Sequence, residues 1–172
     1  VQGNQGFMRK SKMSVLERLL LSKVRRTYGI KPSIGLIKKA AELAALYFVP
    51  ENRVNGMEHL EEVRRLLNEG RRVEIVANHS SDADFPVLED ALRRNGFPDL
   101  AERLLPLYGE KLERSFGTML YARAFRRIPV WSPYTETQSE GEKQQKIIVN
   151  LSAIKAAQRA VTDGDIVVIF PD

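Results

Sequence analysis

His79 and Asp84 are the two residues of this sequence best suited to acid–base chemistry. They lie five positions apart in a polar turn that also contains Asn78, Ser80 and Ser81. A neutral imidazole can remove a proton from a hydroxyl when a carboxylate holds its other nitrogen and stabilises the resulting cation. Because the spacing lets the aspartate side chain fold back to the ring, we predict that His79 is a general base oriented by Asp84. We interpret the two serines as structural, since His79 is the one base near them in the sequence.

Two other interpretations of this turn remain open. Turns of this composition also form and cap helices without any catalytic role. In addition, Asp82 and Asp84 make an Asp-x-Asp pair that could hold a divalent cation through hard oxygen ligands. The rest of the chain is rich in Lys and Arg and offers no clear cluster of further ligands. We therefore expect neither a metal nor a bound cofactor. His59, the other histidine, lies among acidic residues, and we expect it to be solvated or packed.

The segments on either side of the turn predict where it lies in the fold. Residues 73–77 form a short apolar run rich in β-branched side chains, which is typical of a buried strand. Residues 85–94 have a helical pattern, with Pro86 in the first turn and Gly96 after the end. The turn is therefore expected between the carboxyl end of a strand and the start of a helix, where ligands bind in open α/β sheets.

Strand and helix patterns alternate along the rest of the chain and predict an α/β fold, with a mostly parallel or mixed sheet flanked by helices. Strands are expected at residues 104–108, 127–131 and 166–170, and helices at residues 57–68, 109–125 and 141–162. Pro129 places its strand at an edge or at a bulge. The apolar stripe expected to pack the last helix on the core consists of Ile147, Ile148, Leu151, Ile154, Ala157 and Val161.

Composition narrows the class of protein. Hydrophobic residues make up 43% and charged residues 28% of the 172 residues, as in ordinary globular proteins. The chain has no cysteine, which excludes disulfides, thiol catalysis and Cys-ligated zinc. No apolar run reaches the ~20 residues that a membrane span needs, and no signal peptide is evident. These features predict a cytoplasmic protein or one of an organelle stroma.

Charge divides the chain into two parts. Residues 1–48 hold ten Lys/Arg and two Asp/Glu, a balance of +8, whereas residues 49–172 have a balance of −3. Two amphipathic helices, at 14–28 and 34–48, predict a basic helical hairpin over residues 1–49, ahead of an α/β domain over residues 50–172. A basic arm attracts acidic partners, such as anionic lipid, an acidic carrier protein or nucleic acid. The alternative is a hairpin that packs on its own α/β domain.

The residues of the turn resemble a known family. Asn78-His79-Ser80-Ser81-Asp82-Ala83-Asp84 matches the Asn-His-x-Ser-x-x-Asp block of the glycerophospholipid acyltransferases, the His-x4-Asp enzymes, and is most similar to that of the soluble, plastid-type glycerol-3-phosphate acyltransferases. In that family the histidine is the general base and the aspartate orients it. The acceptor hydroxyl then attacks the thioester of acyl-CoA or acyl-carrier protein. The resemblance implies these roles for His79 and Asp84.

Two later segments resemble the family more weakly. Residues 128–132 lie where the second block forms a strand that helps to bind the acceptor, but the family's common Gly and Arg are replaced by Arg126 and Ser132. The plastid-type enzymes tend to have Ser there, followed by basic residues, whereas this chain continues with residues 133–135, Pro-Tyr-Thr. Residues 169–172 match the start of the third block, Phe-Pro-Glu-Gly, with Asp172 in place of Glu. Because Val1 is no initiator and the chain stops here, we expect a fragment whose α/β domain is cut short at its C-terminal end. The candidate substrate-binding residues are Ser81, Arg126, Arg127, Ser132, Pro171 and Asp172, of which the two arginines suit a phosphate.

Together these patterns predict an acyltransferase of phospholipid biosynthesis that transfers a fatty acyl group from acyl-carrier protein or acyl-CoA to a hydroxyl of glycerol 3-phosphate. Two alternatives are a lysophosphatidate acyltransferase and a non-catalytic lipid- or carrier-binding protein on the same fold. The expected partners are the acyl donor and a glycerol phosphate or lysophospholipid acceptor, with peripheral contact with a membrane as a further alternative. Nucleic acid is not among the expected partners.

Overall fold

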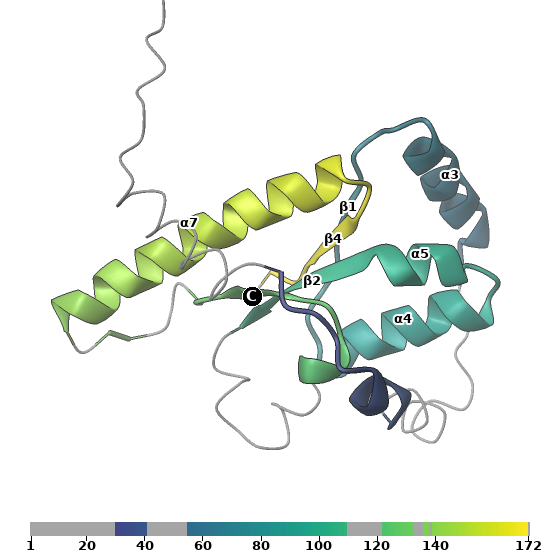
Figure 1. Cartoon of the computed structure of the whole chain (residues 1–172). Coiled ribbons are helices and arrows are strands. Elements are labelled where there is room, and N and C mark those ends of the chain that lie inside the picture. Colours follow the sequence, from purple (N-terminus) through teal and green to yellow (C-terminus); the bar gives the residue numbers. More distant parts are fainter. Residues whose placement is uncertain (1–29, 41–54, 110–121, 133–135, 138, 172) are drawn as a thin grey trace, which may run out of the picture.

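A four-stranded parallel sheet flanked by helices forms the centre of the molecule (Figure 1). The computed structural model describes residues 30–40, 55–109, 122–132, 136–137 and 139–171. Its strands are β1 (Glu74–Val76), β2 (Leu104–Gly109), β3 (Ile128–Val130) and β4 (Ile166–Ile169), in the order β1-β4-β2-β3. The α/β class and the mostly parallel sheet expected from the sequence are confirmed.

The last strand in the sequence lies inside the sheet. β4 pairs in parallel with β1 on one side, where Ile75 is opposite Val168, and with β2 on the other, where Leu105 is opposite Val167. Both faces of β4 are buried, as its continuous apolar sequence requires. Since all four strands are parallel, their carboxyl ends lie at one edge of the sheet, and the chain segments that leave them meet there.

The two outer strands differ in how well they were predicted. β3 is at an edge of the described sheet and carries Pro129 opposite Tyr108, as the proline requires. β1 was expected to be buried, and this was wrong. It is the other edge strand of the described sheet, and Glu74 and Val76 are exposed, Val76 by 67%. Only alternate side chains of this strand face the core, so its apolar run is buried on one side alone.

Helices cover the two faces of the sheet. α3 (Met57–Asn68), α4 (Asp84–Arg94) and α5 (Pro98–Arg103) pack on the side of Ile166 and Val168, while α7 (Glu140–Thr162) packs on the side of Val167 (Figure 1). α3 has the predicted bounds, and α4 and α7 each begin one residue earlier than expected. Among the described residues, no helix has both the length and the apolar character needed to cross a bilayer.

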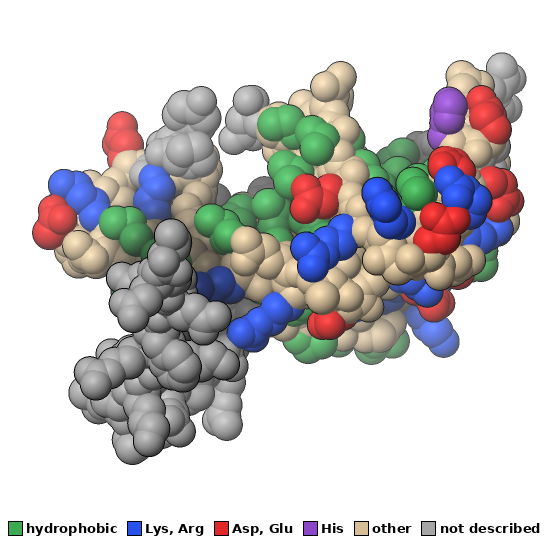
Figure 2. Space-filling view, turned by 90° about the horizontal axis from the view of Figure 1, so that it is seen from above, with side chains coloured by type: hydrophobic (Ala, Val, Ile, Leu, Met, Phe, Trp, Pro, Cys, Tyr) green, Lys and Arg blue, Asp and Glu red, His purple; other side chains and the backbone are tan. Residues whose placement is uncertain are grey.

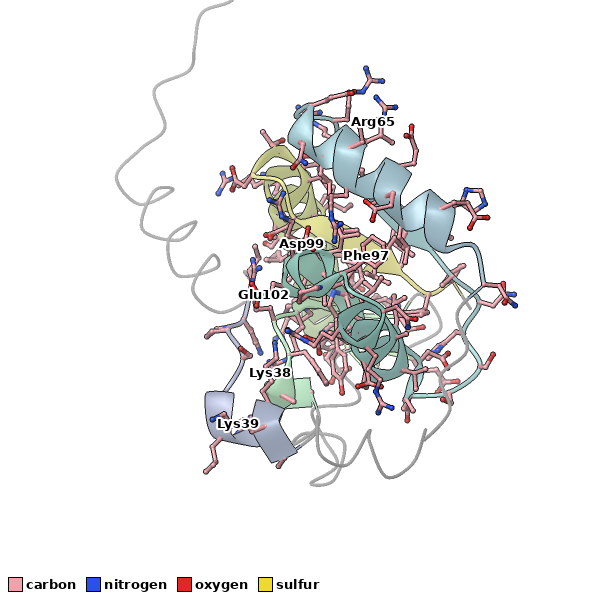
Figure 3. The ribbon with its side chains drawn as sticks, turned by 90° about the vertical axis from the view of Figure 1, so that its right-hand side faces the viewer. Lys38, Lys39, Arg65, Phe97, Asp99 and Glu102 are labelled. Carbon is pink, nitrogen blue, oxygen red and sulfur yellow. The ribbon has the colours of Figure 1, made fainter. Side chains whose placement is uncertain are left out.

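The short helix α5 was not predicted. Its six residues are too few to show a helical period, and the pattern around Pro98 indicates only a break in the chain. Pro98 in fact begins the helix, where its missing N–H costs little. Arg64 of α3 connects α3 with α5, since it pairs with Asp99 at 2.8 Å and stacks over Phe97 at 4.4 Å. Figure 3 shows Phe97 and Asp99.

α7 has the predicted length but not the predicted orientation. Ser139 caps it by accepting a hydrogen bond from the Glu142 N–H at 3.2 Å. The buried residues of the helix are Val149, Ala153, Ala160 and Val161. Four members of the predicted stripe are instead 44–55% exposed: Ile147, Ile148, Leu151 and Ile154. Apolar residues are spread around the helix among polar ones, so periodicity could not identify its core face, and small alanines let it approach the sheet closely.

The described part of the predicted hairpin is attached to the α/β domain. Residues 35–40 are helical, as expected of the second hairpin helix, whereas the first, at 14–28, lies outside the described residues. Lys31 and Arg127 exchange two backbone hydrogen bonds, of 2.9 and 3.1 Å. Lys38 forms an ion pair of 3.0 Å with the buried Glu89 of α4 (Figure 3).

The helix expected at 109–125 is described only at residues 122–124, which are helical.

Candidate active site

The turn between β1 and α4 holds the Asp84 carboxylate in one position. The backbone N–H groups of Ser80 and Ser81 donate to Oδ2 at 2.6 and 2.9 Å, and the Ser81 hydroxyl donates to Oδ1 at 3.2 Å. The same hydroxyl accepts a hydrogen bond from the Ala83 N–H at 3.1 Å. Asp84 is also the first residue of α4, where the helix dipole favours a negative charge. This agrees with the structural role that the sequence indicates for the serines.

The imidazole of His79 completes this arrangement. Its Nδ1 lies 3.1 Å from Asp84 Oδ2, and its ring packs on Phe170 with centroids 5.4 Å apart. An ionised carboxylate can only accept hydrogen bonds, so Nδ1 must carry the proton. In the neutral ring the lone pair is then on Nε2, on the far side of the imidazole from Asp84. This is the tautomer that a general base acting through Nε2 requires.

The hydrogen bonds of the turn make Asp84 an unusually strong acid. Donation by the Ser81 backbone N–H is the largest effect on the pKa of Asp84, and burial opposes it. With donation by the Ser80 N–H, the His79 ring and the Ser81 hydroxyl added, the pKa is lowered to about 2. The carboxylate therefore stays ionised at any pH where the imidazole is neutral. Its charge is available to orient His79 and to stabilise the imidazolium that proton transfer creates.

This pKa predicts an acid-sensitive contribution to stability. Because the pKa is lower in the folded state, the contribution is complete above the unfolded value near 4 and is lost as the pH falls toward about 2. We expect Asp84→Asn to lower the free energy of unfolding by about 1–2 kcal/mol at pH 7. The difference from wild type should shrink toward pH 2.

Urea unfolding at pH 7 and near pH 2.5 measures this effect, with Asp82→Asn as the control. Asp82 is an exposed carboxylate two positions away, so it tests for the loss of one negative charge. A deficit of Asp84→Asn that is the same at both pH values would contradict the assignment of the stabilisation to the ionised Asp84.

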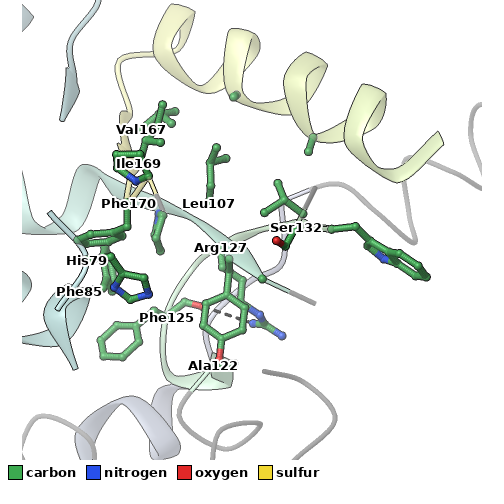
Figure 4. A pocket seen from close by; sticks show the side chains of 18 of the residues that line it. His79, Phe85, Leu107, Ala122, Phe125, Arg127, Ser132, Val167, Ile169 and Phe170 are labelled. Atoms are coloured by element: carbon green, nitrogen blue, oxygen red, sulfur yellow. Dashed lines mark hydrogen bonds between the residues drawn. The ribbon is translucent and has the colours of Figure 1, made fainter. Parts of the chain in front are cut away.

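A cavity of about 920 Å³ lies beside His79, within the size range of ligand sites. It follows the carboxyl edge of the sheet and extends over the face that α7 covers (Figure 4). Its polar end is lined by His79, Ser81, Asp82, Arg127 and Ser132. Its apolar part, between the sheet and α7, is lined by Leu107, Val130, Ala153, Ala157, Val167 and Ile169. The histidine thus borders a cavity whose walls are mostly apolar, with aromatic as well as aliphatic side chains.

The structure separates the two adjacent arginines. Arg127 is 4% exposed and lines the cavity, and its Nη1 donates to the Phe125 carbonyl at 3.5 Å (Figure 4). Arg126 lies away from the cavity, at the amino end of the sheet, where its two Nη atoms pair with the Asp165 carboxylate at 3.0 and 2.7 Å. The prediction of Arg126 as a substrate-binding residue therefore has no support from this geometry.

The other predicted substrate-binding residues have different positions. Ser81, Ser132 and Pro171 all line the cavity, each just beyond the carboxyl end of its strand. Ser81 is also committed to Asp84 through its hydroxyl. Asp172 lies outside the described residues. His59, expected to have no functional role, is 84% exposed on α3 beside Glu58.

The geometry of the turn does not support the metal-binding alternative. Both oxygens of Asp84 are engaged by the turn, and Asp82 is exposed. Within the described ranges, no group of three or more His, Asp or Glu side chains is placed to hold a metal ion.

Asn150 of α7 is a site residue that sequence reasoning missed. Its side chain accepts from the Trp131 N–H at 2.9 Å and donates to the Trp131 carbonyl at 3.0 Å. It thereby takes the place of a neighbouring strand and fixes the end of β3, next to Ser132 in the cavity wall. The polar side chain of Asn150 between apolar neighbours was the signal available in the sequence. It did not identify the strand that Asn150 would contact.

The fold and site define the chain as an α/β protein with a His–Asp pair at the carboxyl edge of a parallel sheet, beside a largely apolar cavity. The chain matches no protein-family model, and no curated protein matches it.

Proposed function

We propose that this chain is an O-acyltransferase that moves a fatty acyl group from acyl-carrier protein or acyl-CoA to a hydroxyl of glycerol 3-phosphate. The observation that carries the proposal is the position of the His79–Asp84 pair at the mouth of a cavity whose inner part is aliphatic. A chamber of this kind suits an acyl chain, and the pair supplies a base next to it. The resemblance of residues 78–84 to the first block of the glycerophospholipid acyltransferases supports the same conclusion.

The chemistry needs only a base, a nucleophile and a thioester. Nε2 of His79 removes the proton from the acceptor hydroxyl while that oxygen attacks the thioester carbonyl carbon. The tetrahedral intermediate collapses as the C–S bond breaks, which forms the ester and releases the thiolate. The imidazolium then gives its proton to the thiolate, so the enzyme returns to its starting state. Asp84 stabilises the imidazolium throughout, as its low pKa allows.

Arg127 supports an acceptor that carries a phosphate. Its guanidinium lies in the wall of the cavity, in the same polar end as His79 and Ser132 (Figure 4). Guanidinium groups bind phosphate oxygens through two parallel hydrogen bonds, and a site shielded from water strengthens such contacts. A phosphate held by Arg127 would keep the acceptor hydroxyl at the end of the cavity that contains the base.

The test offers labelled acyl-CoA and acyl-carrier protein, each with glycerol 3-phosphate and with lysophosphatidate, to the wild-type protein and to His79→Ala. We expect ester formation by the wild type, and a rate lower by about 10²–10⁴-fold in the variant, because a positioned general base contributes that much. The pair of substrates that reacts identifies the donor and the acceptor, and reaction with lysophosphatidate alone would favour the alternative acceptor.

Two results would count against the proposal. Equal turnover in the folded His79→Ala protein would contradict the base. Binding of acyl-carrier protein or lipid with no transfer from any donor would favour the non-catalytic binding protein.

A further inference from the structure

The outward face of α7 is apolar over two turns. Ile147, Ile148, Leu151 and Ile154, here called the α7 stripe, are 52%, 44%, 54% and 55% exposed. Their spacing of one, three and three residues places them on one side of the helix. Four bulky aliphatic side chains on neighbouring positions are unusual for a surface that meets only water, and such patches commonly mark contact with a partner or a membrane.

The charges around the α7 stripe indicate which kind of partner binds it. α7 contains Lys143, Lys146, Lys155 and Arg159, and its two acidic residues, Glu140 and Glu142, lie in its first turn, where Glu140 pairs with Lys143 at 3.1 Å. From residue 147 to residue 162 the helix has no acidic residue, and the exposed Lys155, one turn after Leu151, and Arg159 place positive charge beside the stripe. An apolar stripe bordered by Lys and Arg is the composition of a helix that lies in the interface of an anionic bilayer. In the view from above, hydrophobic side chains reach the surface among both basic and acidic side chains (Figure 2).

The same charges argue against two other occupants. A second copy of the chain would place its own basic α7 face against this one in a symmetric contact, and the like charges would repel. The basic arm at residues 1–48, with a balance of +8, would meet the same repulsion. An anionic surface has the complementary sign.

We propose that α7 docks the protein on an anionic lipid surface, with the α7 stripe in the outer acyl region and its cations among the headgroups. Ile154 belongs both to the stripe and to the wall of the cavity, together with Ala157 and Gln158. Docking therefore brings the apolar part of the cavity next to the lipid. The proposed membrane binding depends only on the exposed face of α7 and its charge. The use of this docked position for acyl transfer rests on the proposed function.

The test measures partition of the full chain onto vesicles of phosphatidylcholine, with and without 30% phosphatidylglycerol, by co-sedimentation at about 0.1 M salt, where surface charges still act over about 10 Å. The first variant, Ile148→Gln/Leu151→Gln, removes apolar surface outside the cavity wall. The second, Lys155→Gln/Arg159→Gln, removes charge. Leu36→Gln is the control, because Leu36 is an 81% exposed apolar residue on a different helical segment.

We expect wild type to bind the anionic vesicles at least tenfold more tightly than the neutral ones. The apolar variant should lose about tenfold or more on both, and the charge variant about fivefold per cation on anionic vesicles only. Leu36→Gln should bind as wild type does. Circular dichroism establishes that the variants are folded.

Three outcomes would overturn the proposal. One is the absence of vesicle binding by wild type, and another is a loss confined to Leu36→Gln. The third is binding to acyl-carrier protein, and not to vesicles, that the α7 variants abolish. None of these outcomes depends on a measurement of acyl transfer. A failed transfer assay therefore counts against the proposed function, and a failed vesicle assay counts against docking through α7.

Discussion

Replacement of Asp84 by asparagine is expected to lower kcat for acyl transfer by about 10³–10⁴-fold, the largest effect of any conservative change in this chain. The carboxylate accepts the Nδ1 proton of His79 at 3.1 Å and so leaves Nε2 as the base. An asparagine whose oxygen takes the place of Oδ2 keeps the Ser80 and Ser81 N–H bonds and still accepts from Nδ1, but it carries no charge. The rate is expected to fall because the imidazolium that proton transfer creates then has no carboxylate to stabilise it.

Single-turnover rates of wild type and Asp84→Asn, with saturating acceptor, measure this effect. Asp82→Asn is the matched control, since it removes a neighbouring carboxylate that does not contact His79, and we expect its rate to remain within about threefold of wild type. If Asp82→Asn lost as much activity as Asp84→Asn, and EDTA abolished the wild-type rate, the metal-dependent alternative would replace the His–Asp mechanism.

The second large effect is expected at Arg127. We expect Arg127→Met to raise KM for a phosphate-bearing acceptor by about 100-fold, which corresponds to about 3 kcal/mol for a charged hydrogen-bonded contact shielded from water. In the proposed function the acyl donor occupies the apolar part of the cavity, so its KM should change little. Steady-state kinetics with each substrate varied in turn separate the two values.

Arg126→Met is the internal control for this prediction. Arg126 carries the same charge at the adjacent position but pairs with Asp165, away from the cavity. Its replacement should lower stability by about 1 kcal/mol, as for a partly exposed ion pair, and leave both KM values near those of wild type. Because Arg127 is buried, urea unfolding of Arg127→Lys and Arg127→Met must accompany the kinetics. Equal effects on KM from the two arginines, or none from either, would contradict the assignment of the acceptor phosphate to Arg127.

The His79–Asp84 pair could be predicted from the sequence because its geometry is local. Seven residues contain the base, the carboxylate that orients it and the serines that hold the carboxylate, and a turn of this length closes on itself without help from the rest of the fold. The helix ends were predictable for a similar reason. Gly70 and Gly96, which have positive φ and follow α3 and α4, are helix-ending signals that act within a few residues.

Features that depend on long-range pairing were not predictable. The pattern of residues 73–77 indicates a strand, but the edge position of β1 follows from where β4 inserts, and β4 lies about 90 positions further along the chain. The apolar residues of α7 are spread around the helix, so the sequence could not tell whether its alanines or its isoleucines would face the sheet. Close packing on β4 selects the small residues and leaves the α7 stripe exposed.

The sequence by itself therefore determined the alternation of strands and helices and the pairing of His79 with Asp84, since both depend on residues close together in the chain. The tertiary structure decided which of two adjacent arginines reaches the cavity. Neighbouring residues of an extended segment point in opposite directions, so Arg126 turns to Asp165 and Arg127 turns inward. It also decided that Asn150, Ile169 and Phe170, remote in sequence from the turn, complete the walls of the cavity beside His79. The reason is that parallel pairing brings the carboxyl ends of all four strands to one edge of the sheet.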